Sequence, residues 1–148
     1  MTPMTERGAN SLKLLLVDDD DVDIRGVRRK LRDLALDLPL TVAYDGEEAL
    51  SILRGGDGNP PFAEPYVIML DLNMPRMNGL EFLAELRRDP RLKRAIVFVF
   101  STSEAAEDIR KAYDLNVAGY VHKSESQHSL AEFLVMISEY CHIVRLPA

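Results

Sequence analysis

Polar residues that could do acid, base or metal chemistry come directly after several short apolar runs of the sequence. Asp18 and Asp19 follow LKLLLV, and Asp71 follows VIML. Ser101 and Lys123 end two later runs of the same kind. Because open parallel sheets bind ligands at the carboxyl ends of their strands, we expect these side chains to meet at one sheet edge. Three carboxylates would then lie beside a hydroxyl and an ammonium group.

Such a carboxylate cluster needs positive charge, since ionised carboxylates at close range repel each other. Lys123 supplies one unit of charge, and a hard divalent cation would supply two more. Mg²⁺ usually takes one or two carboxylates and keeps several waters. The pattern therefore favours a magnesium site with room for a phosphate oxygen. The other acids of the first run, Asp20, Asp21 and Asp23, are equally typical of a solvated helix start.

The elements that must position these residues alternate between two periodicities. Five apolar runs of β-branched and aromatic character, typical of buried strands, cover residues 12–17, 40–44, 67–70, 95–100 and 119–122. Helical spacing of apolar residues is found at about 24–34, 46–53, 78–88, 104–114 and 130–141. This alternation predicts an α/β fold with helices on both faces of a parallel sheet. We expect a flavodoxin-like, doubly wound (βα)5 domain with a five-stranded parallel sheet in the order 2-1-3-4-5.

Three local features of these elements carry expectations of their own. The helix at 104–114 offers mainly alanines to a core, so it should be the least firmly anchored. The segment 55–65 (GGDGNPPFAEP) is typical of a surface loop and lacks a phosphate-loop motif. Gly79 is predicted to be a tight-turn residue before the third helix. Either Ser126 or Ser129 could cap the fifth helix.

Composition excludes several classes of partner and compartment. The chain has 148 residues, a formal charge of −6 and a pI near 5.1, and so has no electrostatic basis for binding nucleic acid or an anionic membrane. Residues 1–11 are a polar tail without a signal sequence, and the lone Cys141 cannot form an intramolecular disulfide. We therefore expect a cytoplasmic protein with a buried free thiol. The three histidines, His122, His128 and His142, lack metal-ligand spacing.

Four segments resemble the motifs of two-component response-regulator receiver domains, and they occur in the right order over residues 12–141. They are LLLVDDDD, VIMLDLNMPRMNGLEFL, VFSTS and GYVHK. The resemblance implies that Asp71 accepts a phosphoryl group from a sensor histidine kinase, in a switch protein rather than an enzyme. It also implies Mg²⁺ ligation by Asp19, Asp71 and the main-chain carbonyl of Asn73, with Asp18 acting through water. Lys123 would help to neutralise the transferring group.

The same resemblance assigns roles in switching and hydrolysis. Ser101 matches the hydroxyl that binds the attached phosphoryl group, and Tyr120 matches the aromatic switch residue that turns inward. Asn73 and Ser103 match the positions that line the approach of hydrolytic water. Because both are small and polar, we expect a phospho-Asp71 of intermediate lifetime.

One position departs from the family pattern, which commonly has proline after the lysine. Here Ser124 follows Lys123, and without proline a cis peptide is costly, so the loop is expected to be trans and differently shaped. This serine, the long 55–65 loop and the short C-terminus resemble the small stand-alone regulators paired with bacterial phytochrome kinases. A bacteriophytochrome is therefore a candidate kinase partner.

The predicted organisation is a flexible tail at 1–11, a receiver domain at 12–142 and a C-terminal extension at 143–148. Since no effector domain follows the fifth helix, the signal should pass through a phosphorylation-controlled surface to a downstream protein. The resemblance implies that the basic first helix and the loops around Asp71 face the kinase, and that the fourth and fifth helices form the output or homodimer side. The apolar segment 142–146 (HIVRL) is expected to support a homodimer.

Two alternatives are weighed against this interpretation. A haloacid-dehalogenase-like aspartyl phosphatase or phosphotransferase also uses an aspartyl nucleophile, but that family needs DxDx[TV], and Asn73 stands where its acid-base aspartate should be. A degenerate receiver that binds a partner without phosphorylation has no support either, because the complete set of site residues is present: Asp18, Asp19, Asp71, Ser101 and Lys123.

Overall fold

The computed structural model describes residues 12–123 and 127–147, apart from the side chains of 127, 128 and 141. Its elements are β1 (Lys13–Val17), α2 (Asp21–Asp33), β2 (Leu40–Ala43), α3 (Gly46–Arg54), β3 (Tyr66–Leu70), α4 (Gly79–Arg88), β4 (Ile96–Ser101), α5 (Ala106–Asp114), β5 (Gly119–His122) and α6 (Gln127–Ile143). The predicted tail at 1–11, the caps considered at Ser126 and the loop shape at Ser124 lie outside the described residues.

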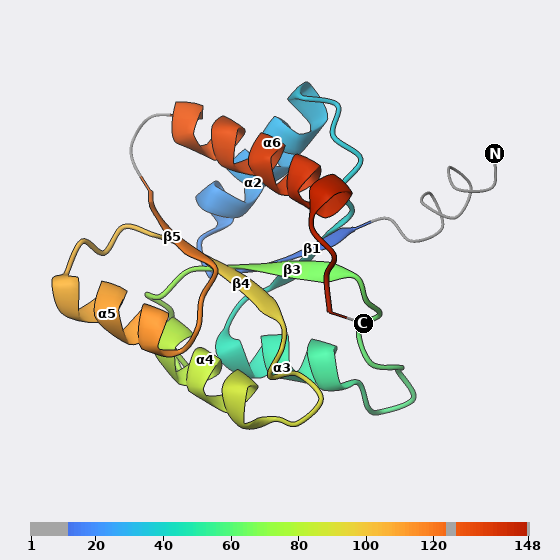
Figure 1. Cartoon of the computed structure of the whole chain (residues 1–148), viewed down its shortest axis with the longest axis vertical. Coiled ribbons are helices and arrows are strands. Elements are labelled where there is room, and N and C mark those ends of the chain that lie inside the picture. The colour runs from blue at the N-terminus through green and yellow to red at the C-terminus, as the bar shows by residue number, and fades with distance from the viewer. Residues whose placement is uncertain (1–11, 124–126, 148) are drawn as a thin grey trace.

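The five strands form one parallel sheet in the order β2-β1-β3-β4-β5. Helices α2 and α6 cover one face, and α3, α4 and α5 cover the other (Figure 1). The predicted flavodoxin-like doubly wound architecture is thus confirmed. Strand boundaries differ from the expected ones by one residue at most, as in β3, which begins at Tyr66 instead of residue 67.

Each face of the sheet has its own apolar core. One core packs β-strand residues such as Leu15 and Ile68 against Phe82 of α4, and the other packs Leu14 and Val67 against the α2 and α6 helices. All residues of β3 are buried, which explains why its sequence is a continuous apolar run and not an alternating one. Within the described residues, no helix is long and apolar enough to cross a membrane.

Side-chain caps fix the starts of α2 and α4 at the carboxyl edge of the sheet. The Asp20 carboxylate accepts from the Val22 amide at 2.8 Å and starts α2. Asn78 and Glu81 form a reciprocal capping box at the start of α4, with both hydrogen bonds at 2.9 Å. These caps hold the helix N-termini, with their exposed amide donors, next to the ends of β1 and β3.

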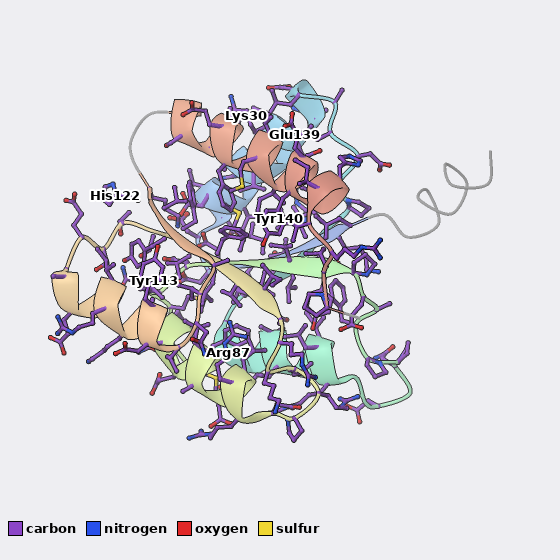
Figure 2. The ribbon with its side chains drawn as sticks, viewed as in Figure 1. Lys30, Arg87, Tyr113, His122, Glu139 and Tyr140 are labelled. Atoms are coloured by element: carbon purple, nitrogen blue, oxygen red, sulfur yellow. The ribbon has the colours of Figure 1, made fainter. Side chains whose placement is uncertain are left out.

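Helix α5 is anchored differently. Its N-cap residue, Ala105, provides no side-chain cap, and Ala112 is the one buried residue of the helix. The far end is held by Arg87 of α4 (Figure 2), whose guanidinium donates to the carbonyls of Leu115 and Asn116 at 2.7 and 3.0 Å. The predicted weak burial of this helix is confirmed, and its firm attachment lies at its C-terminal end.

The predicted role of Gly79 as a tight-turn residue is wrong. Gly79 is the first residue of α4, and its amide donates to the Leu72 carbonyl at 3.0 Å. A Cβ at this position would lie 2.5 Å from the Asp71 carbonyl oxygen and 2.6 Å from the Leu72 Cα. Glycine is therefore required because the helix start packs directly on the backbone that carries Asp71. The loop at 55–65, by contrast, is the predicted turn-rich connection and holds a bridge between Gly56 and Asn59.

Two glycine substitutions with opposite expected effects test this close packing. We expect Gly79→Ala to lower the free energy of unfolding by about 1–3 kcal/mol, because the backbone next to Asp71 must shift. Gly26→Ala, in the interior of α2, meets nothing within 4 Å and should instead raise it by about 0.5–1 kcal/mol. Urea unfolding measures both values. A Gly79→Ala protein as stable as Gly26→Ala would contradict the packing explanation.

Candidate functional site

The sheet topology brings the predicted chemical residues to one edge. Strand β1 pairs with β3 so that Val17 lies opposite Leu70, and each strand is followed directly by an aspartate, Asp18 or Asp71. The backbone continues this pairing, since the Asp71 amide donates to the Val17 carbonyl at 2.9 Å. Beyond β4 and β5, the Lys123 amide donates to the carbonyl at the end of β4 at 2.7 Å. The predicted convergence is therefore present.

Three carboxylates form the centre of the site. Oxygen atoms of Asp18, Asp19 and Asp71 all lie within 4.8 Å of one another. Asp18 and Asp71 are buried, with 2% and 7% of their surface exposed, whereas Asp19 is exposed to solvent. This set of hard oxygen donors, two fixed and one open to water, fits the ligand preference of Mg²⁺.

Main-chain amides orient the two buried carboxylates. Asp18 Oδ1 accepts from the Asp20 amide at 2.9 Å, and Asp71 Oδ1 accepts from the Asn73 amide at 3.3 Å. Each carboxylate thus has one oxygen held by its own following loop. Oδ2 of each faces the centre of the site, where the lysine lies.

The Lys123 ammonium lies among three carboxylates. Its Nζ is 2.9 Å from Asp18 Oδ2, 2.7 Å from Asp23 Oδ2 and 3.6 Å from Asp71 Oδ2. The lysine side chain is nearly covered, with 10% exposed, and lies 6.0 Å from the ring centre of Phe100. The ammonium therefore makes two hydrogen bonds, to Asp18 and Asp23, and only a longer ion pair with Asp71.

Burial dominates the electrostatics of the site. It raises the pKa of Asp18 to about 6, although the Lys123 charge acts in the opposite direction. It also raises the pKa of Asp71, again against the attraction of Lys123. For Lys123, burial alone would lower the pKa, but the Asp18 charge and the Asp23 hydrogen bond outweigh it and raise the pKa. The carboxylates thus hold more negative charge than one lysine can offset, and a cation would relieve this imbalance.

A hydrogen-bonded chain leads from Ser101 to the start of α5. The fully buried Ser101 Oγ accepts from the Ser103 amide at 3.2 Å, and the Tyr120 hydroxyl donates to the Ser103 carbonyl at 2.8 Å. The Ser103 hydroxyl in turn donates to Asp108 in the first turn of α5 at 2.7 Å. Ser103 therefore contacts the site, the aromatic residue and the helix at once.

The remaining sequence predictions have mixed outcomes. The exposed His122, which lacks metal-ligand spacing in the sequence, forms a hydrogen bond with the Thr102 carbonyl at 3.1 Å (His122 is labelled in Figure 2). The side chains of His128 and Cys141, including the predicted buried thiol, lie outside the described residues. Sequence reasoning missed Asp23 as a contact of Lys123. In the sequence Asp23 is typical of a solvated helix start, because it lies in the first turn of α2, and its spacing does not indicate Lys123 as its partner.

Comparison with known proteins agrees with this geometry. The model of the response regulator receiver domain family matches residues 14–135. The response regulator Rcp1 of Synechocystis sp. is 36% identical over 138 residues, covering 91% of this chain and 92% of that protein. The phosphorylated cyanobacterial phytochrome response regulator RcpA has a similar structure, with a TM-score of 0.78, 36% identity and coverage of 92% and 98% of the two chains.

A second solved structure bears on the metal. The Mn²⁺-bound form of response regulator Rcp1 matches with a TM-score of 0.78 and 35% identity, covering 92% of this chain and 99% of that one.

The haloacid-dehalogenase alternative receives no support, because the matched family and its relatives are receivers. On the family match, the fold and the relatives together, this chain belongs to the response regulator receiver domain family.

Proposed function

We propose that this protein is a stand-alone response regulator that accepts a phosphoryl group on Asp71 from a sensor histidine kinase, in a reaction that requires Mg²⁺. The observation that carries the proposal is the gathering of Asp18, Asp19 and Asp71 oxygens within 4.8 Å, with the Lys123 ammonium 3.6 Å from Asp71. A nucleophile, a set of oxygen ligands and a fixed cation are what phosphoryl transfer asks of a protein.

In the transfer step, a carboxylate oxygen of Asp71 forms a bond to phosphorus as the bond from phosphorus to the histidine nitrogen of the kinase breaks. The product is an acyl phosphate. Asp19, Asp71 and the Asn73 carbonyl would hold the metal, with Asp18 acting through water. When bound, the metal would neutralise charge on the transferring oxygens. Lys123 would neutralise a further oxygen, and the Asn73 amide already orients the Asp71 carboxylate.

Switching would pass through Ser101 and its neighbours. When Asp71 carries a phosphoryl group, the Ser101 hydroxyl would donate to it, and the rotation disturbs the bond that Ser101 now accepts from the Ser103 amide. Ser103 also holds Tyr120 and Asp108, so the change would reach β5 and α5 directly. The small side chains of Asn73 and Ser103 would leave the approach of hydrolytic water open, giving the phospho-protein an intermediate lifetime.

The partner proposal is a phytochrome-type histidine kinase. It is supported by the similarity to RcpA, whose structure is described as that of a phytochrome response regulator, at 36% identity over nearly the whole chain. The face formed by α2 and the loops around Asp71 would meet the kinase. A receiver domain at 12–142 with a short C-terminal extension, acting in the cytoplasm, is the organisation we propose.

A homodimer is proposed at the C-terminal end. Ile143, the last residue of α6, is 81% exposed, and Met136 is 40% exposed on the same helix. Leu146 instead packs against the core that the chain forms with α2 and α6. Within the 142–146 segment, Leu146 therefore contributes to the fold, whereas Ile143 would contribute to the dimer contact. A contiguous exposed apolar patch marks an association surface, and we propose that Ile143 and Met136 contribute to one.

Phosphorylation at Asp71 is tested by incubation with Mg²⁺ and a small phosphodonor, or with beryllium fluoride as a mimic. We expect Asp71→Asn to lose labelling entirely, since the amide is not a nucleophile that forms an acyl phosphate. Asp57→Asn, in the exposed loop at 55–65, is the control and should label like the wild type. Labelling of Asp71→Asn at the wild-type level would overturn the assignment.

Metal binding is tested by thermal unfolding with and without Mg²⁺ at neutral pH. A ligand that binds the folded state stabilises it by mass action, so we expect the midpoint to rise by about 3–6 °C when Mg²⁺ is about tenfold above its Kd. Asp19→Asn should lose most of this shift, because it removes one charged oxygen ligand from the carboxylate set. Since Asp19 is exposed to solvent, the substitution leaves the core intact. The control variant Asp21→Asn also removes one negative charge, at the start of α2, and should keep the Mg²⁺-dependent rise of the midpoint. Equal shifts in both variants would argue against the ligand set.

The dimer is tested by light scattering coupled to gel filtration. We expect a wild-type dimer, and a shift of Ile143→Ser toward the monomer because the substitution removes an exposed apolar contact without touching the core. Val22→Ser is the matched control, since Val22 is 67% exposed on α2. A monomeric wild type, or an Ile143→Ser protein as dimeric as Val22→Ser, would refute the proposed interface.

A further inference from the structure

Asp23 makes the shortest contact of the site lysine. Its Oδ2 is 2.7 Å from Lys123 Nζ, compared with 2.9 Å for Asp18 and 3.6 Å for Asp71. Asp23 is not part of the carboxylate set that could hold a metal, because that set consists of Asp18, Asp19 and Asp71. The lysine is therefore bonded to a carboxylate that has no part in the chemistry proposed above.

The two hydrogen bonds of Lys123 differ in how easily they could open. The side chain of Asp18 is 3% exposed, and its other oxygen is fixed by the Asp20 amide at 2.9 Å. The side chain of Asp23 is 35% exposed at the start of α2. Water can therefore replace the ammonium at Asp23, whereas a buried carboxylate left without its partner is costly. The Asp23 bond is the one that can be exchanged.

We propose that Asp23 is a positioning residue that holds the Lys123 ammonium away from Asp71 in the unmodified protein and competes for it with the attached phosphoryl group. This inference rests on the proposed function of Asp71. A lysine ammonium has three donors and no fixed fork geometry, so it can exchange one carboxylate oxygen for a phosphoryl oxygen by a small movement. Asp23 would then lower the yield of the phosphorylated state.

The exchange has a structural consequence. Lys123 follows β5, and Asp23 lies in the first turn of α2, 100 positions earlier in the chain. Their bond ties the two elements together across the edge of the sheet. Transfer of the ammonium to the phosphoryl group would release this tie, so α2 would respond to phosphorylation together with the Ser101 side of the site.

The test compares the beryllium fluoride affinity of two matched variants in Mg²⁺, followed by the ¹⁹F NMR signal of the bound mimic. Asp23→Asn and Asp21→Asn remove the same charge from the same turn of α2, and only Asp23 contacts Lys123 in the described structure. We expect Asp23→Asn to bind about three- to tenfold more tightly than Asp21→Asn, because the ammonium is released from a charge-assisted bond. Asp23→Glu should restore affinity toward the wild-type value.

The direction of the change separates positioning from simple structural support. If Asp23 only stabilised the fold, its loss would weaken binding or leave it unchanged, and either result overturns the proposal. A second measurement tests the Asp23–Lys123 bond itself and does not depend on the proposed phosphorylation of Asp71. In a double-mutant cycle of Asp23→Asn with Lys123→Met, urea unfolding in EDTA should give a coupling of at least about threefold in the unfolding equilibrium constant.

Different results of the two measurements would refute different proposals. A wild type that binds no beryllium fluoride would refute the proposed phospho-acceptor, and the competition that depends on it, even if the cycle shows coupling. A wild type that binds it, with Asp23→Asn no tighter than Asp21→Asn, would refute only the role of Asp23. A cycle without coupling would show that the Asp23–Lys123 bond is not made in solution and would equally refute that role.

Discussion

The attraction between one ammonium and the surrounding carboxylates is the interaction on which the rest of the site depends. Lys123 joins segments that are distant in the chain, and its partners follow β1, begin α2 and follow β3. Charges this well covered are stabilising only when they are paired and hydrogen-bonded. The single lysine leaves negative charge in excess, which favours a cation at the site, and the phosphoryl transfer proposed for Asp71 would depend on that cation.

The fold maintains this unfavourable arrangement by rigid support from the backbone. The carboxylates follow strands whose pairing is fixed along their whole length, so Asp18 and Asp71 cannot move apart without breaking the sheet. Gly79 brings the start of α4 against the Asp71 carbonyl, where any side chain would force a shift. Close packing under Asp71 and capped helices beside it hold like charges together, at an energetic cost that is offset by the two apolar cores.

The sequence allowed prediction of those features that arise from local pattern. Apolar runs located every strand, and polar residues at the ends of four of the five runs located the site, because strand ends in a parallel sheet share one edge. The pairing of Asp23 with Lys123 could not be found this way, since it depends on which side of α2 meets β5. The role of Gly79 was also missed, because the sequence shows a glycine before a helix but not the backbone that lies against it. Contacts between distant segments are set by packing, not by spacing.

The two ends of α5 are held unequally, and the hydrogen-bond chain through Ser103 reaches the end that is held less firmly. At its C-terminal end the helix is held by Arg87 and by the burial of Ala112. At its N-terminal end the helix has no side-chain cap, and the Ser103 hydroxyl supports it by donating to Asp108 and accepting from the Ala105 amide. In the switch proposed above, a bond broken at Ser103 would therefore act on the end of α5 that is less firmly held, because local stability is lowest where few contacts hold an element.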